Sequence, residues 1–133
     1  MMHDPLEQMA EVTRVRFERE YARIAALVEE EVTLRKQLAQ IKAQIGAGHV
    51  TLQGPDMTIQ AMSAGLLWQS WSTRHRARLE QELAGVLARK AVVLAEVRIA
   101  FGRKDAVDRM QTQEARDRAA ARTKAQFNRL MGL

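Results

Sequence analysis

The feature that most constrains the fold of this 133-residue chain is a run of apolar residues spaced three and four positions apart. This spacing places the residues along one side of an α-helix, and the run has neither a proline nor the alternation of a β-strand. The stripe is slightly wider than the a/d seam of a coiled coil, and Lys90 and Lys104 lie within it. Its members are Leu79, Leu83, Val86, Leu87, Val93, Leu94, Val97, Phe101, Val107 and Met110. A helix with such a stripe needs a partner to cover it.

The N-terminal part of the chain has the periodicity of that partner. Asp4 and Pro5 form a typical helix start, an N-cap followed by proline at the first helical position. Over nearly six heptads, nine of twelve a and d positions are apolar, which is typical of a coiled-coil seam. The a positions are Ala10, Phe17, Ile24, Glu31, Leu38 and Ile45, and the d positions are Leu6, Thr13, Glu20, Leu27, Leu34 and Ile41. The acidic exceptions either face Lys90 or arginines across an antiparallel pair or lie at the edge of the seam.

Glycine and proline then interrupt the pattern between Gly46 and Pro55. Glycines just past a helix end and proline in the first turn of the next helix predict a turn. We therefore expect one all-α domain over residues 1–133, a long antiparallel two-helix coiled-coil hairpin with helix 4–46, tip loop 47–55 and a longer helix 56–131. The first helix would cover about residues 56–100 of the second, from the equal rise of the two helices. The segment from Phe101 onward would then project nearly alone, which suggests a partner or self-association.

Composition and spacing exclude several classes of function. The chain has no cysteine, which excludes disulfides, thiolate metal sites and a cysteine nucleophile. The three histidines are far apart, and the glycines lack the lysine and serine or threonine of a phosphate loop. We expect no enzyme activity, no metal and no cofactor. The N-terminus lacks the order of a signal peptide and no apolar run approaches a membrane span, so we expect a cytoplasmic protein without membrane insertion.

Two groups of residues are candidates for binding a partner. Trp68 and Trp71 lie three residues apart, directly before Arg74 and further basic residues. Three interpretations remain open: packing on the first helix near Leu34, a protein interface, or nucleic-acid binding through stacking and phosphate contacts. The second group comes from the projecting segment and comprises Arg103, Lys104, Val107, Arg109 and Met110. Acids alternate with bases beyond Arg109, which favours a mixed-charge protein groove over a nucleic acid.

A shorter first helix, a Gly/Pro tip and a longer arginine-rich second helix resemble the FliJ/YscO family, the small coiled-coil proteins of flagellar and virulence type III secretion systems. The residues that support the resemblance are Phe17–Tyr21, Leu27–Val32, the tip, and Ala91–Arg98 with Arg103 and Lys104. The resemblance implies a stalk in the pore of the hexameric export ATPase that links the ATPase to the membrane export gate. It also implies that Arg103, Lys104 and Arg109 lie near the ATPase ring, and that Trp68, Trp71 and Arg74 face the gate.

The leading hypothesis is thus a non-enzymatic adaptor or stalk of a type III export apparatus, cytoplasmic and peripheral to that apparatus. Its partners would be the export ATPase, the export gate and export chaperones, and the chain itself a monomer or weakly self-associating. One alternative is a basic coiled-coil protein that binds nucleic acid, because residues 74–104 have eight Lys/Arg against three Asp/Glu. Another is a homo-oligomeric coiled-coil scaffold, in which the exposed stripe pairs with a copy of itself.

Overall fold

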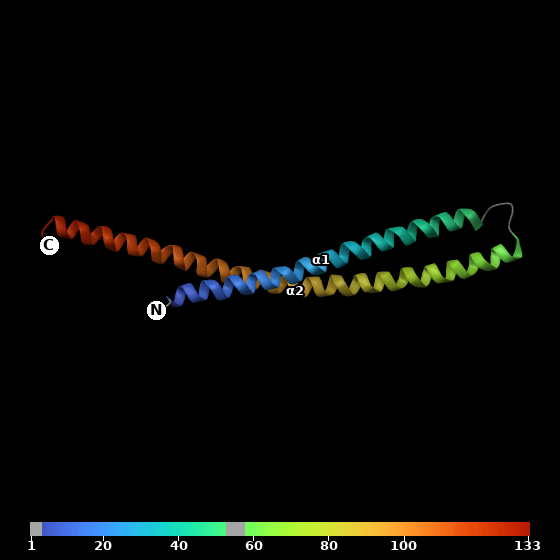
Figure 1. Cartoon of the computed structure of the whole chain (residues 1–133), viewed down its shortest axis with the longest axis horizontal. Helices are drawn as coiled ribbons and strands as arrows, with labels where there is room; N and C mark the ends of the chain where they lie inside the picture. Colours follow the sequence, from blue (N-terminus) through green and yellow to red (C-terminus); the bar gives the residue numbers. More distant parts are fainter. Residues whose placement is uncertain (1–3, 53–57) are drawn as a thin grey trace. The chain divides into compact units, whose positions relative to one another are not determined.

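The computed structural model describes residues 4–52 and 58–133, without the side chains of residues 49–52. These residues form two α-helices, α1 (Pro5–Leu52) and α2 (Ile59–Leu130), and the described ranges contain no strand (Figure 1). The predicted all-α helical hairpin with a longer second helix is confirmed. No helix of the described chain is both long and apolar enough to cross a bilayer.

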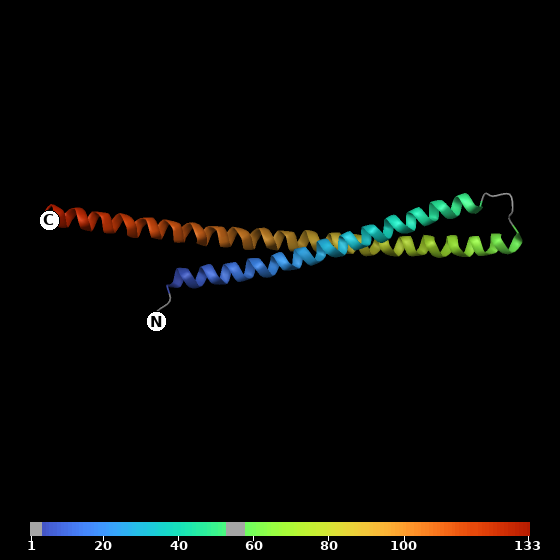
Figure 2. The same cartoon turned by 45° about the horizontal axis from the view of Figure 1, so that its top comes forward.

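The chain forms two compact units, and each unit contains part of α1 and part of α2. The turn unit contains residues 24–92, and the terminal unit contains residues 4–23 and 93–133. In the turn unit Gly48 approaches Trp68 while Glu31 pairs with Lys90, so the two helices run in opposite directions. In the terminal unit Arg118 pairs with Asp4 and Glu96 with Arg23, which gives the same antiparallel order (Figure 2).

The ends of the helices are capped by side chains and by one glycine. The Asp4 carboxylate accepts a hydrogen bond from the Leu6 amide at 3.1 Å, as expected for an N-cap. At the start of α2 the Thr58 hydroxyl accepts one from the Ala61 amide at 3.1 Å. The second helix thus begins at Ile59, three residues later than predicted. It ends where Gly132 adopts a φ of 69° and the Leu133 amide donates to the Asn128 carbonyl.

The α1 surface follows the predicted heptad closely. All twelve predicted a and d positions are buried or half-buried, whereas every other described side chain of α1 before Gly48 is exposed. The most buried are Ile24, Leu27, Leu34, Leu38 and Ile41, all in the turn unit. This pattern arises because a seven-residue repeat keeps the same side of a helix against an adjacent helix.

The buried line of α2 is narrower than the predicted stripe. Its most buried residues are seven positions apart: Ser72, Leu79, Val86, Val93, Ala100 and Val107. Three members of the predicted stripe, Leu87, Phe101 and Met110, are exposed instead. The prediction was wrong for these three because they extend the stripe beyond the side that α1 covers.

Gly46 and Gly48 do not end α1, which continues to Leu52. The predicted tip loop 47–55 is therefore wrong for residues 47–52, and residues 53–55 lie outside the described chain. Gly48 has a packing role, because a Cβ atom at this position would lie 2.5 Å from Cζ3 of Trp68. The glycine thus allows the indole ring of α2 to approach the backbone of α1 closely.

This contact predicts opposite effects for two neighbouring glycines. Gly46→Ala should stabilise the protein by about 0.5–1 kcal/mol, because alanine favours the helix and a Cβ at Gly46 meets nothing within 4 Å. Gly48→Ala should lose that gain and displace Trp68, which tryptophan emission combined with urea unfolding would measure. Equal stabilisation by the two variants would contradict the packing of Trp68 on Gly48.

The terminal unit corrects the expected overhang. Phe101 does not project alone, since its ring lies 5.8 Å from that of Phe17, and Arg118 pairs with Asp4 at 3.6 Å. The register of this unit differs from the predicted one, because Asp4 lies beside Arg118 whereas the first helix was expected to reach only about residue 100. The pair of Arg118 with Asp4 therefore extends the contact between the helices well beyond Phe101, and the residues of α2 after Arg118 form the end of that helix.

Candidate interaction surfaces

Both acidic seam residues are paired with bases. Lys90 Nζ lies 2.9 Å from one carboxylate oxygen of Glu31, and Arg35 Nε lies 3.0 Å from the other. In the terminal unit, Arg23 Nη1 lies 2.7 Å from carboxylate oxygens of both Glu20 and Glu96. The expectation that a seam glutamate faces Lys90 is confirmed for Glu31. These pairs allow two carboxylates to occupy positions that the heptad assigns to apolar residues.

The surrounding charges shift the ionisation of these groups. The hydrogen bond from Lys90, followed by that from Arg35, holds the pKa of Glu31 below its ordinary value of 4.5. The carboxylate of Glu96, followed by that of Glu20, raises the pKa of Arg23. A carboxyl group with a lower pKa in the folded state stabilises the fold above its unfolded-state pKa. That contribution is lost as the pH falls below 4.5 and through the lower folded-state pKa of Glu31.

We therefore expect Glu31→Gln to reduce stability at neutral pH and to have less effect at an acidic pH below the lowered pKa of Glu31, where the wild-type carboxylate is itself protonated. Urea unfolding followed by circular dichroism at both pH values would measure this difference. Glu30→Gln is a matched control, because Glu30 is more exposed and its carboxylate lies 3.7 Å from Arg89. An equal destabilisation by Glu31→Gln at the two pH values would contradict the role assigned to its charge.

The structure separates the two predicted tryptophans. Trp68 is half-buried on Gly48, as the packing interpretation predicts, although its contact lies nearer the turn than Leu34. Trp71 is 52% exposed, and its ring stacks on that of His75 at 5.0 Å. Arg74 is exposed and its Nε donates to the Ser70 carbonyl at 3.4 Å, so its side chain folds back toward the start of α2. Trp71 and Arg74 are therefore available to a partner, whereas Trp68 mainly holds the two helices together.

The second group of predicted binding residues, between Arg103 and Met110, also contains both buried and exposed side chains. Val107 is only 4% exposed and belongs to the core of the terminal unit, so the expectation that it projects toward a partner is wrong. Lys104 is half-buried, with its Nζ 6.0 Å from the centroid of the Phe17 ring and 3.1 Å from the Asp108 carboxylate. Arg103, Arg109 and Met110 are exposed, although Arg109 is already paired with Asp105 at 3.0 Å.

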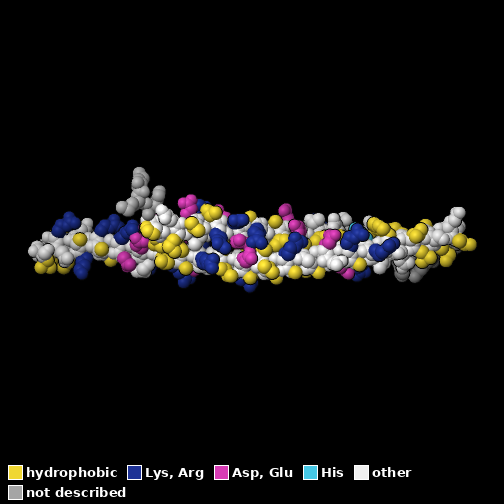
Figure 3. All heavy atoms as spheres, turned by 90° about the horizontal axis from the view of Figure 1, so that it is seen from below, with side chains coloured by type: hydrophobic (Ala, Val, Ile, Leu, Met, Phe, Trp, Pro, Cys, Tyr) yellow, Lys and Arg dark blue, Asp and Glu magenta, His cyan; other side chains and the backbone are white. Residues whose placement is uncertain are grey.

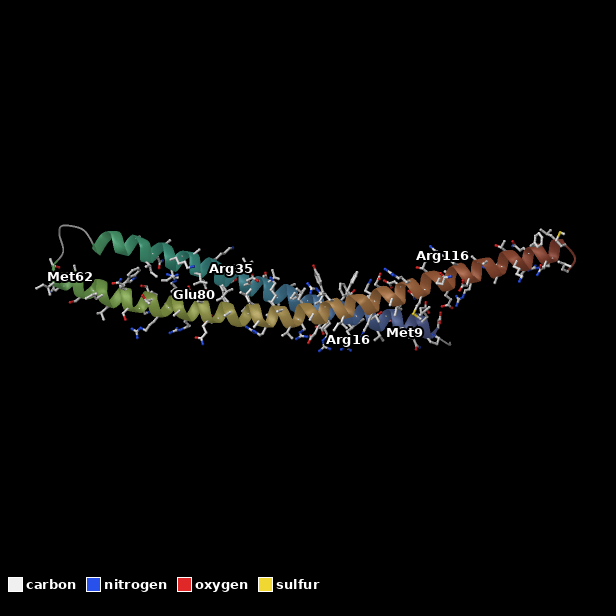
Figure 4. All side chains as sticks on the ribbon, turned by 180° about the vertical axis from the view of Figure 1, so that it is seen from behind. Met9, Arg16, Arg35, Met62, Glu80 and Arg116 are labelled. Atoms are coloured by element: carbon white, nitrogen blue, oxygen red, sulfur yellow. The ribbon has the colours of Figure 1, made fainter. Side chains whose placement is uncertain are left out.

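The last three turns of α2 form a surface that the sequence patterns did not single out. We name residues 119–130 the distal segment. All its side chains are exposed except that of Asn128, which is half-exposed, and the segment contains no acid. Its bases, Arg122, Lys124 and Arg129, have no ion pair within the described chain. The preceding Arg116, on the same helix, is labelled in Figure 4.

The sequence contained a signal for this surface. The acids that alternate with bases all precede Arg118, and two of them are held within α2: Glu114 pairs with Arg118, and Asp117 accepts a hydrogen bond from Gln113. Residues 109–129 have mixed charge as a whole, but their last acid is Asp117. All charged side chains of the distal segment are therefore basic, and Phe127 and Leu130 are large apolar side chains exposed on it.

Comparison of the chain with protein-family models, with curated proteins and with solved structures found no match.

Proposed function

We propose that this protein is a non-enzymatic stalk or adaptor of a flagellar or virulence type III export apparatus, cytoplasmic and peripheral to that apparatus. Its terminal unit would engage the export ATPase ring, and its turn unit would face the export gate. Export chaperones are further candidate partners. The architecture supports the proposal, because the resemblance implies two antiparallel helices of unequal length, with an arginine-rich second helix.

The observation that carries the proposal is the composition of the distal segment. It is helical, contains only basic charges and extends beyond the residues that α1 contacts in the described chain. A helix of this kind gains little from its own hydrogen bonds in water and is stabilised by packing on a partner. Its unpaired bases would complement an acidic surface, and Phe127 and Leu130 would supply apolar contacts.

The same absence of acids favours a second candidate function, the binding of nucleic acid. Arg122, Lys124 and Arg129 have no acid between them and form no ion pair within the described chain, so no carboxylate within the distal segment would repel a phosphate. Binding of this kind would weaken steeply as salt is raised, since it depends on the release of counterions.

Affinity capture from cells that contain a type III export apparatus, at moderate salt and with nuclease treatment, tests the two functions against each other. The stalk function predicts recovery of the export ATPase or a gate component whether or not nuclease is added. Addition of the purified chain should also increase ATP hydrolysis by the purified ATPase. Loss of every partner on nuclease treatment would instead support nucleic-acid binding and reject the stalk.

A further inference from the structure

The first four turns of α2 differ from the rest of that helix in having no charged side chain. Residues 59–73 contain neither acid nor base, whereas three arginines follow within the next five positions. On the face shown in Figure 3, yellow and white side chains form the end of the molecule where α2 begins, and dark-blue side chains appear only farther along. Among the described residues, the start of α2 is therefore uncharged on its exposed sides as well as on the side that faces α1.

The apolar side chains of this segment are exposed on more than one side of the helix. Ile59, Met62 and Leu66 follow one another at steps of three and four and form one line. Leu67 and Trp71, four residues apart, form a second line on a different side, and all five side chains are at least half-exposed. We name these five residues the apolar collar. Figure 4 labels Met62 near the start of α2.

The second line of the apolar collar continues directly into bases. Leu67, Trp71, Arg74 and Arg78 are separated by steps of four, three and four, so they lie on the same side of α2. The guanidinium of Arg74 folds back toward Ser70, beside Trp71. An aromatic ring followed by arginines, next to an uncharged apolar segment, is the order of side chains found where a helix enters a lipid headgroup layer.

We propose that the apolar collar docks on the surface of an anionic phospholipid bilayer. The apolar side chains would enter the boundary between headgroups and acyl chains, and Arg74 and Arg78 would contact lipid phosphates. The observation that favours an anionic bilayer is the continuation of the second line of the collar into Arg74 and Arg78, whose charges complement lipid phosphates. The contact is a shallow one at the membrane surface, which requires no membrane-spanning helix and goes beyond the docking to an export gate proposed above.

Polar residues limit how deeply residues 59–73 can enter the bilayer. Gln60 and Gln69 lie within it, and burying either amide in hydrocarbon would be unfavourable. A helix at the boundary is immersed by about 5–10 Å, which accommodates leucine and tryptophan side chains while glutamines stay hydrated. Each arginine near an anionic surface then adds attraction that salt weakens.

The two tryptophans of the chain both lie in this segment, so their fluorescence reports directly on docking. We expect vesicles of phosphatidylcholine and phosphatidylglycerol to shift the emission of the purified full-length chain to shorter wavelength and to sediment the protein. Brominated acyl chains in those vesicles should quench the emission, because Trp71 would lie near them. Pure phosphatidylcholine vesicles should bind at least about tenfold more weakly.

Two variants separate the collar from the rest of the helix. Leu66→Glu combined with Leu67→Glu should weaken vesicle binding at least about tenfold with an unchanged circular dichroism spectrum, because both side chains are exposed. Val92→Glu combined with Ile99→Glu, at two exposed positions of α2 outside the collar and the distal segment, is the matched control and should bind as the wild type does. Absence of vesicle binding, equal binding to both lipid compositions, or binding unaffected by the double variant would each overturn the proposal. Because these vesicles contain no export component, the result is independent of the stalk function.

Discussion

Val86→Asp is expected to lower the free energy of unfolding by about 3–5 kcal/mol, because it places a carboxylate in a core that offers it no partner. Val86 is 2% exposed and belongs to the line of α2 that faces Leu34 and its neighbours in the turn unit. Domains of this size are stable by about 5–15 kcal/mol, so the loss is a large fraction of the total. Thermal and urea unfolding followed by circular dichroism would measure it.

Leu87→Asp is the matched control. Leu87 adjoins Val86 and is the larger hydrophobic residue, but 38% of its surface is exposed. A carboxylate at this position stays in contact with water, so we expect a loss of about 1 kcal/mol or less. Lowering the pH should restore part of the stability of Val86→Asp, since burial raises the pKa of a carboxyl group. Equal losses for the two variants would contradict the narrow seam of α2.

Val86 and Leu87 are both apolar, but only Val86 is buried, so the sequence alone did not predict which side of α2 faces α1. The α1 seam was predictable at all twelve positions, because its apolar residues fit one heptad and flanking positions are mostly polar. On α2, apolar residues lie on several adjacent sides of the helix, and the side that is buried is determined by contact with α1. Ser72 is fully buried and Ala100 nearly so, although neither is a strong hydrophobic signal.

The turn and the register were less predictable for a related reason. Gly46 and Gly48 are helix-ending signals in isolation, but the Trp68 ring that packs on Gly48 is 20 residues away in the sequence and on another helix. In the terminal unit, Arg118 pairs with Asp4, which is likewise distant in sequence and on the other helix. Contacts of this kind, and not local patterns, determine where the distal segment begins.

The second large effect is expected from reversing the charges of the distal segment. Replacing Arg122, Lys124 and Arg129 together by Glu should weaken binding to the export ATPase at least tenfold, about 1.4 kcal/mol or more. All three bases are exposed and unpaired within the described chain, so the hairpin itself should keep its helical content and its unfolding midpoint. Surface plasmon resonance or sedimentation with the purified ATPase would measure the change in affinity.

Two further sets of variants test whether the loss of affinity for the ATPase arises from the distal segment. Arg103→Glu with Arg109→Glu should cause a smaller loss, because Asp105 already neutralises much of the Arg109 charge. Lys104 is left out of that variant, since a carboxylate there would lie close to Asp108 and remove the cation that contacts Phe17.

The neutral variant with Gln at positions 122, 124 and 129 separates lost attraction from new repulsion. It should bind more weakly than the wild type and more tightly than the Glu variant, and raised salt should reduce the differences among the three proteins. If the Glu variant binds the ATPase with wild-type affinity, the distal segment is not the contact with the ring. If instead the ATPase binds neither the wild type nor the variants, the stalk function itself is wrong, because that function requires the chain to engage the ring.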